Sequence, residues 1–465
     1  MKSYWYIGLL IVAVLIATTN TSCKKDLLMS DGALEFSVDT VVFDTVFTTV
    51  GSTTKRFKIY NPSNRPVKID KINLSGGEDS KFRFNLDGVS GTQFSDINIP
   101  GNDSLFGFVE VTLDPNNQSL PLIIEDSITF TTNNVDQRVL LAAWGQDAYF
   151  HYNDTVEGTW PNDKPHVIYG FSMVDPNTEL IIQEGTKVHL HKNSLLYIRE
   201  GSLQVNGTVD DKVIFEGDRL ESFYEDVKGQ YYGIYFEKAI SSSINHAIIK
   251  NGTAGIHVFS ENESNTDYTL RITNSEVYNH ASYGIFNYES GRIAGENLLV
   301  HNNTLYGFFQ LEGGSYNFSH CHFLGYGTDG NQPAVAIRNY FTRNDGITYV
   351  GDIAEGSIFN SIIYGSGENQ IAYDTINADG QVSINYTYRN NLIRLESTLN
   401  AGPSVSDNIW NTDPLFENIE ERIFKYPSNS LVNNNGSPVH TNEPNDIEGN
   451  PRDLSNPDIG AYQLH

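Results

Sequence analysis

One feature constrains the fold of this chain more than any other: short apolar strands recur at intervals of roughly 20 to 30 residues through its second half. Four of these strands start with Gly followed by Ile or Phe, at Gly233, Gly255, Gly284 and Gly307. Corner-forming Asn residues lie between them, at Asn251, Asn279 and Asn302. Because stacked repeats bury a continuous core, the pattern predicts a right-handed parallel β-helix with interior columns of Ile, Val and Phe and a corner of stacked Asn side chains.

The first third of the chain has a different pattern. Apolar residues alternate with polar ones, as at Phe57 and Ile59 or at Val109 and Val111, and turn-forming clusters separate the runs. A period of two without helical stretches is typical of an antiparallel sandwich that buries one face of each sheet. The segment 57–69 (FKIYNPSNRPVKI) resembles the Hydin-type immunoglobulin-like domains of bacterial surface proteins, which implies the same fold but no particular ligand.

The N-terminus has the order of a secretory signal peptide. Lys2 precedes an apolar run at 7–17, which at about 11 residues is too short for a bilayer that needs about 20. Cys23 follows small and polar residues and resembles the cleavage site of bacterial lipoproteins, although Asn20 stands where that family usually has Leu or another aliphatic residue. The resemblance implies a lipid-modified (palmitoylated) Cys23 and an extracytoplasmic protein anchored at the outer membrane or cell surface. Ordinary secretion without a lipid anchor is the alternative. The sequence does not distinguish the periplasmic from the outward-facing leaflet of the outer membrane.

Two further segments resemble bacterial β-helix proteins. Residues 180–215 are similar to the first coils of β-helix lipoproteins, with an EGT turn and an NGT segment before a VIF strand. Four later motifs resemble, in order, the ending of right-handed β-helix repeat proteins of the PbH1 type: NSIIYG at 360–365, NIWNTDPLF at 408–416, GNPR at 449–452 and DIGAY at 458–462. The resemblance implies a tail that caps the open end of the solenoid, since exposed terminal strands invite edge pairing.

The sequence therefore predicts an all-β protein in five parts. They are a lipoprotein signal peptide at 1–22, a tether at 23–33, an immunoglobulin-like β-sandwich at 34–145, a right-handed parallel β-helix at 146–440 and a C-terminal capping tail at 441–465. Of the two cysteines only Cys321 would remain without lipid, so no internal disulfide forms and Cys321 is expected to be buried.

The charge balance of the chain limits the classes of molecule that it is expected to bind. The chain has 30 Lys and Arg against 57 Asp and Glu, a net charge of −27, and no basic run that could neutralise a phosphate backbone. Nucleic acid is therefore disfavoured. The expected partners are the membrane, through the lipid anchor, and a polysaccharide or surface protein, and no cofactor is indicated. The leading hypothesis is a β-helix that serves as a rigid binding or scaffold surface.

A polysaccharide lyase or glycoside hydrolase on the β-helix is the alternative function. Galacturonan hydrolases of this fold carry, in order, an NTD segment, an Asp pair, a GHG and an RIK. Here Asn265-Thr266-Asp267 follows Asp210-Asp211 instead of preceding it, and neither GHG nor RIK occurs. No catalytic residues are predicted, and whether the protein is an enzyme stays open.

An outward column of aromatic residues is the best candidate for a binding surface. If Ile234, Ile256, Ile285 and Phe308 point inward, the alternation within each strand places the following residues outward. The predicted ligand-binding residues are Tyr235, Glu237, His257, Phe286, Tyr288 and Phe309, with Phe259 and Leu311 beside them. Sugars bind on such rings, because their C–H faces pack on the π-systems. The alternative is that the loop at 216–230 covers the column.

A weaker candidate is a histidine patch on another strand column. With Cys321 inward, His320 and His322 would share an outer face, and stacking would bring His301 and Glu276 near them. Such a set could bind Zn²⁺ or a similar metal. Solvated surface histidines are the favoured interpretation, so no metal site is predicted.

Overall fold

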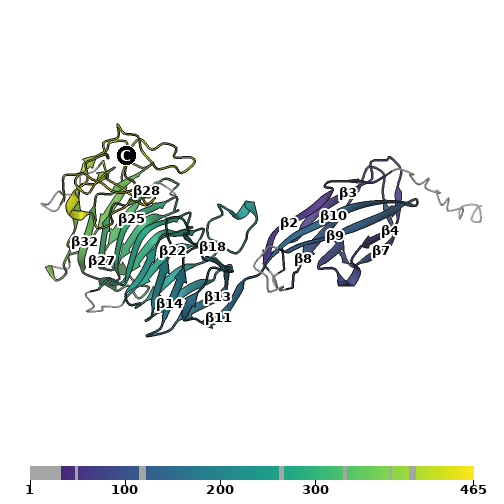
Figure 1. The fold of residues 1–465 in the computed structure, drawn as a ribbon, viewed down its shortest axis with the longest axis horizontal. Helices are drawn as coiled ribbons and strands as arrows, with labels where there is room; N and C mark the ends of the chain where they lie inside the picture. The colour runs from purple at the N-terminus through teal and green to yellow at the C-terminus, as the bar shows by residue number, and fades with distance from the viewer. Residues whose placement is uncertain are drawn as a thin grey trace, which may run out of the picture. The chain divides into compact units, whose positions relative to one another are not determined.

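The computed structural model describes residues 33–47, 51–114, 122–260, 267–327, 332–377, 380–396 and 405–464. The predicted signal peptide, Cys23 and nearly all of the predicted tether lie outside these ranges. The chain divides between Gln146 and Asp147 into two compact units, which are described separately (Figure 1). Within the described ranges no helix is long and apolar enough to cross a membrane.

The first unit is a β-sandwich of two five-stranded sheets. One sheet has the order β1 (Glu35–Phe36), β3 (Lys55–Tyr60), β8 (Ser104–Val111), β5 (Phe82–Leu86) and β6 (Val89–Ser90). The other has the order β2 (Thr40–Phe47), β10 (Val135–Gln146), β9 (Leu122–Thr132), β4 (Val67–Leu74) and β7 (Gln93–Ile99). Alternate residues of both sheets meet in one core, where Phe43 lies 5.9 Å from Phe82 and Phe57 lies 6.4 Å from Phe130 between ring centroids. The strands pair antiparallel as predicted, except that β10 pairs with β2 in parallel.

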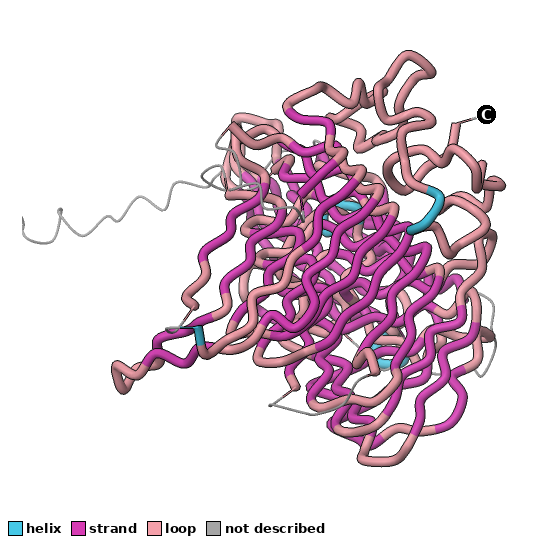
Figure 2. Tube along the Cα trace, turned by 90° about the vertical axis from the view of Figure 1, so that its left-hand side faces the viewer, coloured by secondary structure: helices cyan, strands magenta, loops and turns pink. Residues whose placement is uncertain are grey.

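The second unit is a parallel β-helix. Its described residues form one sheet of 26 strands, in which each strand pairs with its equivalent in the next coil (Figure 2). Each coil contributes to three faces. The all-β architecture predicted from the sequence, a sandwich followed by a parallel β-helix, is thus confirmed.

The strands of each face pair in register along the helix axis. Face 1 comprises β15 (Lys187–Leu190), β18 (Val213–Gly217), β21 (Ala247–Lys250), β28 (His322–Gly325), β33 (Ile362–Gly365), β36 (Leu392–Ile393) and β38 (Ile409–Trp410), the starts of β11 (Tyr149–Thr155) and β13 (His166–Val174), and the ends of β23 (Leu270–Tyr278) and β25 (Arg292–His301). Face 2 comprises β16 (Leu195–Arg199), β19 (Gly233–Glu237), β22 (Ala254–Phe259), β24 (Tyr283–Tyr288), β26 (Tyr306–Leu311), β29 (Val335–Arg338) and β34 (Ile371–Asp374), with the ends of β11 and β13. Face 3 comprises β12 (Gly158–Trp160), β14 (Glu179–Gln183), β17 (Ser202–Asn206), β20 (Ser242–Asn245), β27 (Gly314–Ser319), β32 (Ile353–Phe359), β35 (Thr387–Arg389) and β37 (Val405–Ser406), with the starts of β23 and β25.

A few elements lie outside the three faces. Strands β30 (Tyr340–Thr342) and β31 (Thr348–Val350) form an antiparallel hairpin beside the coil. Short 3₁₀ turns occur at η1 (Gly77–Asp79), η2 (Ser222–Tyr224) and η5 (Pro438–His440).

The interior columns form as the sequence predicts. Ile234, Ile256, Ile285 and Phe308 are in register along face 2, and all four are fully buried. The glycines that precede them are required by the close approach of the next coil. A Cβ at Gly255 would lie 2.6 Å from His280 Nε2, and a Cβ at Gly284 would lie 2.7 Å from the carbonyl oxygen of Gly307. The recurring Gly is therefore needed wherever two coils meet this closely.

Two Asn ladders run along the corners. In the predicted ladder, Asn279 Nδ2 donates to Asn251 Oδ1 at 2.7 Å and Asn302 Nδ2 donates to Asn279 Oδ1 at 2.8 Å. A second ladder, which the sequence reading missed, joins Asn245, Asn274 and Asn297 in the same way. Five of the six ladder residues, all except Asn245, have positive φ, a conformation that Asn tolerates better than most residues do.

The C-terminal segment, residues 412–464 after the last strand β38, lies along the side of the coil, whereas we predicted that a tail at 441–465 caps the open end. Its apolar residues share one cluster with face 1, comprising Leu299, Leu324, Ile362, Tyr364 and Leu392 from the coil and Phe424, Tyr426, Val432, Ile447, Ile459 and Ala461 from the segment. Polar contacts join the segment to separate coils: Asn360 Nδ2 donates to the Ser437 carbonyl, and Asn297 Nδ2 donates to the Asn445 carbonyl, both at 2.8 Å. The DPLF, GNPR and DIGAY motifs thus serve to cover face 1.

Candidate functional site

A ladder of stacked rings runs along the outer side of face 2. It consists of Tyr197, Tyr235, His257, Phe286 and Phe309, which are direct register partners in five successive coils. Successive ring centroids are 5.3, 4.7, 4.6 and 5.3 Å apart. All five side chains are half-buried, because their neighbours in each strand turn into the core while their own outer edges reach solvent. We call these five residues the aromatic ladder.

Three tyrosines widen the aromatic ladder on one side. Tyr283 and Tyr306 stack with centroids 6.0 Å apart, and Tyr283 lies 5.4 Å from the ring of Phe309. The Tyr232 hydroxyl lies 2.7 Å from His257 Nδ1. The sequence reading missed these tyrosines and Tyr197. The three tyrosines directly precede Gly233, Gly284 and Gly307, outside the Gly-Ile and Gly-Phe motifs on which the prediction rests. Tyr197 lies in a coil that has Leu195 where the next coil has Gly233.

A second row lies on the other side of the aromatic ladder, two residues further along each strand. It contains the predicted Glu237, Phe259 and Tyr288 in register, and the rings of Phe259 and Tyr288 stack at 5.6 Å. Glu237 accepts a hydrogen bond from the Tyr197 hydroxyl. Leu311, which we expected at the surface in this row, is 8% exposed. The structure therefore brings all six predicted ligand-binding residues onto one face.

A charged cluster closes this row. Arg343, in the turn between β30 and β31, pairs with Glu289 at 3.3 Å and with Glu312 at 3.0 Å. Its guanidinium also lies 3.9 Å from the centroid of the Tyr349 ring. Beyond Phe309 the ladder position is taken by Ala336, so the rings stop there. Five coils at about 4.8 Å spacing give a ring surface about 19 Å long.

The loop after β18 is held away from the aromatic ladder. The carbonyl of Glu225 accepts from Asn251 Nδ2 at 2.9 Å, and Lys228 Nζ donates to Thr304 Oγ1 at 3.3 Å. Asp226 pairs with Arg422 of the C-terminal segment at 2.8 Å. These contacts lie at the Asn corner and over face 1, so the loop does not bury the rings as the alternative interpretation required.

The aromatic ladder carries no charge at neutral pH. Burial lowers the pKa of His257 to about 4. Burial, together with the neighbouring Tyr232, raises the pKa of Tyr235 to about 12. Both rings are therefore neutral between these values, and the ladder offers flat apolar surfaces bordered by hydroxyl groups. This is the chemistry that suits the C–H face of a sugar ring.

We expect His257 to make the solenoid less stable in acid. The folded state takes up the His257 proton only near pH 4, whereas the unfolded chain takes it up near 6.5, so this contribution to stability is present above 6.5 and is lost as the pH falls to 4. Each pKa unit corresponds to about 1.4 kcal/mol, and solvent at the ring edge reduces the total to about 2 kcal/mol. Urea unfolding of His257→Phe should therefore show a shallower loss between pH 6.5 and 4 than the wild type. An identical loss of unfolding free energy in the variant and the wild type would show that His257 is not the group that destabilises the protein in acid.

The histidines considered for a metal are not on the surface. His320 and His322 are fully buried and His301 is 1% exposed, because the C-terminal segment covers the side of the coil that they face. His301 Nε2 lies 2.9 Å from Glu276 Oε1, while His322 packs against the rings of Phe416 and Tyr462. This corrects the expectation of a solvated patch.

His320 also departs from the predicted alternation. It has a φ of 50° at the corner between β27 and β28, where its Nε2 contacts Thr441 Oγ1 at 2.8 Å. Burial lowers the pKa of His322 to about 3. Across the part of the chain that the structure describes, no group of three or more His, Cys, Asp or Glu residues is placed to hold a metal ion.

A groove lies between face 3 and the C-terminal segment. It comprises two cavities of about 450 and 310 Å³ that share Thr273 and Glu443 in their walls. Burial, and then the charge of Glu296, raise the pKa of the Glu443 carboxyl. Glu296 itself accepts hydrogen bonds from the backbone N–H groups of Asn442 and Glu443 at 2.9 and 3.0 Å, so it holds the segment in place.

Comparison with known proteins identifies no family. No protein-family model matches the sequence, and no curated protein matches it either. One solved structure with some likeness is a family 123 glycoside hydrolase from Clostridium perfringens, at 11% identity and a TM-score of 0.17 over 25% of this chain and 26% of that one. Another is the catalytic unit of a GH87 alpha-1,3-glucanase from Streptomyces thermodiastaticus, at 11% identity and a TM-score of 0.25 over 72% and 80%. At these scores the fold assignment rests on the strand pairing described above.

Proposed function

We propose that this protein is a surface lipoprotein whose β-helix binds a glycan along the aromatic ladder. The observation that carries the proposal is the run of five stacked, half-buried rings, widened by Tyr232, Tyr283 and Tyr306. A contiguous apolar surface of aromatic rings that faces solvent usually marks a binding site. The length of about 19 Å, from a strand spacing of about 4.8 Å, suits several successive sugar units of one chain.

The polar groups around the rings fit the same ligand. The hydroxyls of Tyr232, Tyr283 and Tyr306 and the carboxylate of Glu237 border the aromatic surface and can exchange hydrogen bonds with sugar hydroxyls. A neutral polysaccharide is favoured over an acidic one on this face, since the three carboxylates of Glu237, Glu289 and Glu312 lie beside it and Arg343 offsets one of their charges.

The test is retention of polysaccharides by the double variant Tyr235→Ala/Phe309→Ala. Each ring contributes about 0.5 to 1.5 kcal/mol beyond the area it buries, so losing both should weaken binding roughly tenfold or more. Affinity electrophoresis in gels containing neutral or acidic polysaccharides measures this. Phe223→Ala is the matched control, because Phe223 is 77% exposed on the loop at η2. Equal retention of the double variant and the wild type on every retained polysaccharide would reject the ladder as the site.

Anchoring through Cys23 is a separate part of the proposal. It is supported by the apolar run at 7–17 that ends near Cys23. Cys23→Ala should move the protein from the detergent phase to the aqueous phase on phase separation, because the acyl chains would be absent. A variant that stays in the detergent phase with unchanged mass would show that Cys23 is not the anchor.

A second candidate function is cleavage of a polysaccharide in the groove beside Glu443. A cleft carboxyl with a raised pKa is suited to act as a general acid. Reducing-end assays on the same polysaccharides distinguish the two functions: product formed by the wild type but not by Glu443→Gln supports cleavage, and retention without product supports binding alone.

A further inference from the structure

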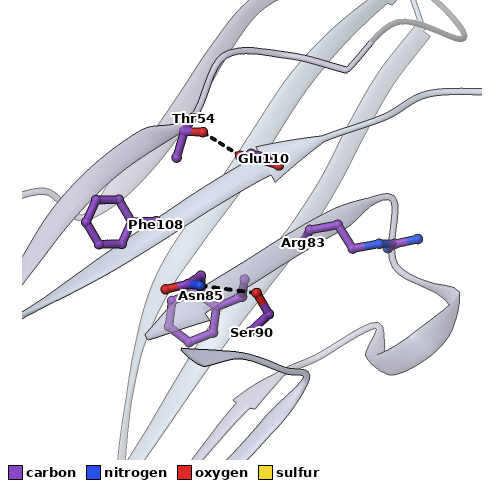
Figure 3. Close-up of a pocket in the computed structure, with 7 residues that line it drawn as sticks. Thr54, Arg83, Asn85, Ser90, Phe108 and Glu110 are labelled. Atoms are coloured by element: carbon purple, nitrogen blue, oxygen red, sulfur yellow. Dashed lines mark hydrogen bonds between the residues drawn. The ribbon is translucent and has the colours of Figure 1, made fainter. Parts of the chain in front are cut away.

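A second recessed surface lies on the sandwich, away from its core. A cavity of about 280 Å³ opens on the outer side of the sheet that contains β3, β8 and β5, and is lined by Thr54, Arg83, Phe84, Asn85, Ser90, Phe108 and Glu110. Figure 3 shows Phe108 and Arg83 at opposite ends of this cavity, with two hydrogen-bonded pairs between them. Thr54 Oγ1 donates to Glu110, and Asn85 Nδ2 donates to Ser90 Oγ at 3.1 Å.

Two phenylalanines occupy the solvent side of the central strand β8. Gly107, Val109 and Val111 turn into the core, so Phe106 and Phe108 point outward, where both are only half-buried. Their rings stack with centroids 6.2 Å apart. Outward positions on a sandwich sheet are normally polar, and an exposed ring pair beside a cavity of polar groups is the arrangement that binds sugars.

Cations surround this ring pair. Across the sheet, Arg56 is the register partner of Phe108, Lys58 of Phe106, and Arg83 of Glu110. Lys58 Nζ lies 5.2 Å from the centroid of the Phe106 ring and 5.7 Å from that of Tyr60. The ion pairs between described residues of the sandwich join Lys68 to Asp96 and Lys81 to Asp114, so they leave Arg56, Lys58 and Arg83 without a carboxylate partner. Three cations against the carboxylate of Glu110, which lines the cavity, leave this part of the face with a positive balance on a chain with a net charge of −27.

We infer that this sandwich face binds an acidic glycan, with one sugar ring packed on Phe108 and its carboxylate held by Arg56 and Lys58. The amide of Asn85 and the hydroxyls of Ser90 and Thr54 supply partners for sugar hydroxyls. Arginine suits a carboxylate because its planar fork can donate two parallel hydrogen bonds. The recessed shape of the cavity favours a sugar unit over a flat anionic membrane. The inference is independent of the aromatic ladder on the β-helix.

Calorimetric titration of the full-length protein in nonionic detergent tests this inference. The Tyr235→Ala/Phe309→Ala variant is used as the background, so that the ladder does not contribute. We expect oligogalacturonate to bind, a neutral cello-oligosaccharide of equal length to bind at least tenfold more weakly, and added salt to weaken the acidic ligand. Phe108→Ala should reduce the affinity for oligogalacturonate roughly fivefold. Arg56→Gln/Lys58→Gln, which changes no buried residue, should reduce it roughly tenfold and diminish the salt dependence.

The control is Arg138→Gln, which removes an exposed cation from β10 in the opposite sheet and should leave the affinity unchanged. Three results would overturn the inference. The first is equal binding of the acidic and neutral ligands, and the second is unchanged affinity in the Arg56→Gln/Lys58→Gln variant. The third is a parent protein that binds no oligogalacturonate but binds vesicles with anionic lipid, and loses that vesicle binding in the Arg56→Gln/Lys58→Gln variant. That third result would assign the basic face to a membrane surface.

Discussion

Replacing Arg452 by alanine should release the C-terminal segment from face 1 and destabilise the protein by about 3 to 5 kcal/mol, because two buried acceptors lose their hydrogen-bond donor at a cost of about 1 to 3 kcal/mol each. Arg452 is 5% exposed. Its Nη2 donates to Asn297 Oδ1 at 2.7 Å and to the carbonyls of Gly460 and Ala461, both at 3.1 Å. Without the guanidinium, Asn297 Oδ1 and the Gly460 carbonyl lose this donor, whereas the Ala461 carbonyl keeps the Ile447 N–H at 3.0 Å. The cluster that covers His322 then opens to water.

Limited proteolysis and thermal melting measure this effect. The variant should be cut within 412–464 under conditions in which the wild type is intact, and its melting midpoint should fall by several degrees. Arg338→Ala is the matched control, because Arg338 forms an exposed pair with Asp374 at 3.0 Å and such pairs contribute little. Equal resistance of the two variants to protease would show that Arg452 does not hold the segment.

Adjacent residues of β26 should respond very differently to the same substitution. Phe308 is fully buried in the interior column, and its ring lies 4.9 Å from that of Phe318. Phe308→Ala leaves a cavity between coils and should cost about 3 to 5 kcal/mol. Phe309→Ala removes a half-buried ring from the aromatic ladder and should cost far less, while it weakens glycan retention.

Urea unfolding of the two variants separates packing from binding. We expect a large fall in midpoint for Phe308→Ala and a small one for Phe309→Ala. Similar large losses in both would mean that the aromatic ladder belongs to the core and is no free surface. The comparison is direct, because the two substitutions remove the same side chain from neighbouring positions of one strand.

Local patterns were sufficient to predict most of the fold. Alternation within strands and the Gly and Asn at each coil placed Ile234, Ile256, Ile285 and Phe308 inside and the predicted ladder residues outside. Cys321, also predicted inside, is fully buried. These features repeat with the coil, and a repeat shows in the sequence because every coil must satisfy the same steric and hydrogen-bonding conditions.

What the sequence did not reveal depends on contacts between distant segments. The motifs near the C-terminus were recognised as an ending, but only the tertiary structure shows that they cover face 1 and bury His301, His320 and His322. Tyr232, Tyr283 and Tyr306, which widen the ladder, and Phe106 and Phe108 on the sandwich were not predicted, because the side chains beside them follow from the pairing of strands. By itself the sequence determined the architecture and the inward and outward positions of the face 2 strands, because these follow from local periodicity. The tertiary structure decided which outward faces remain open to a ligand, because coverage depends on segments more than a hundred residues apart, as between Asn297 and Arg452.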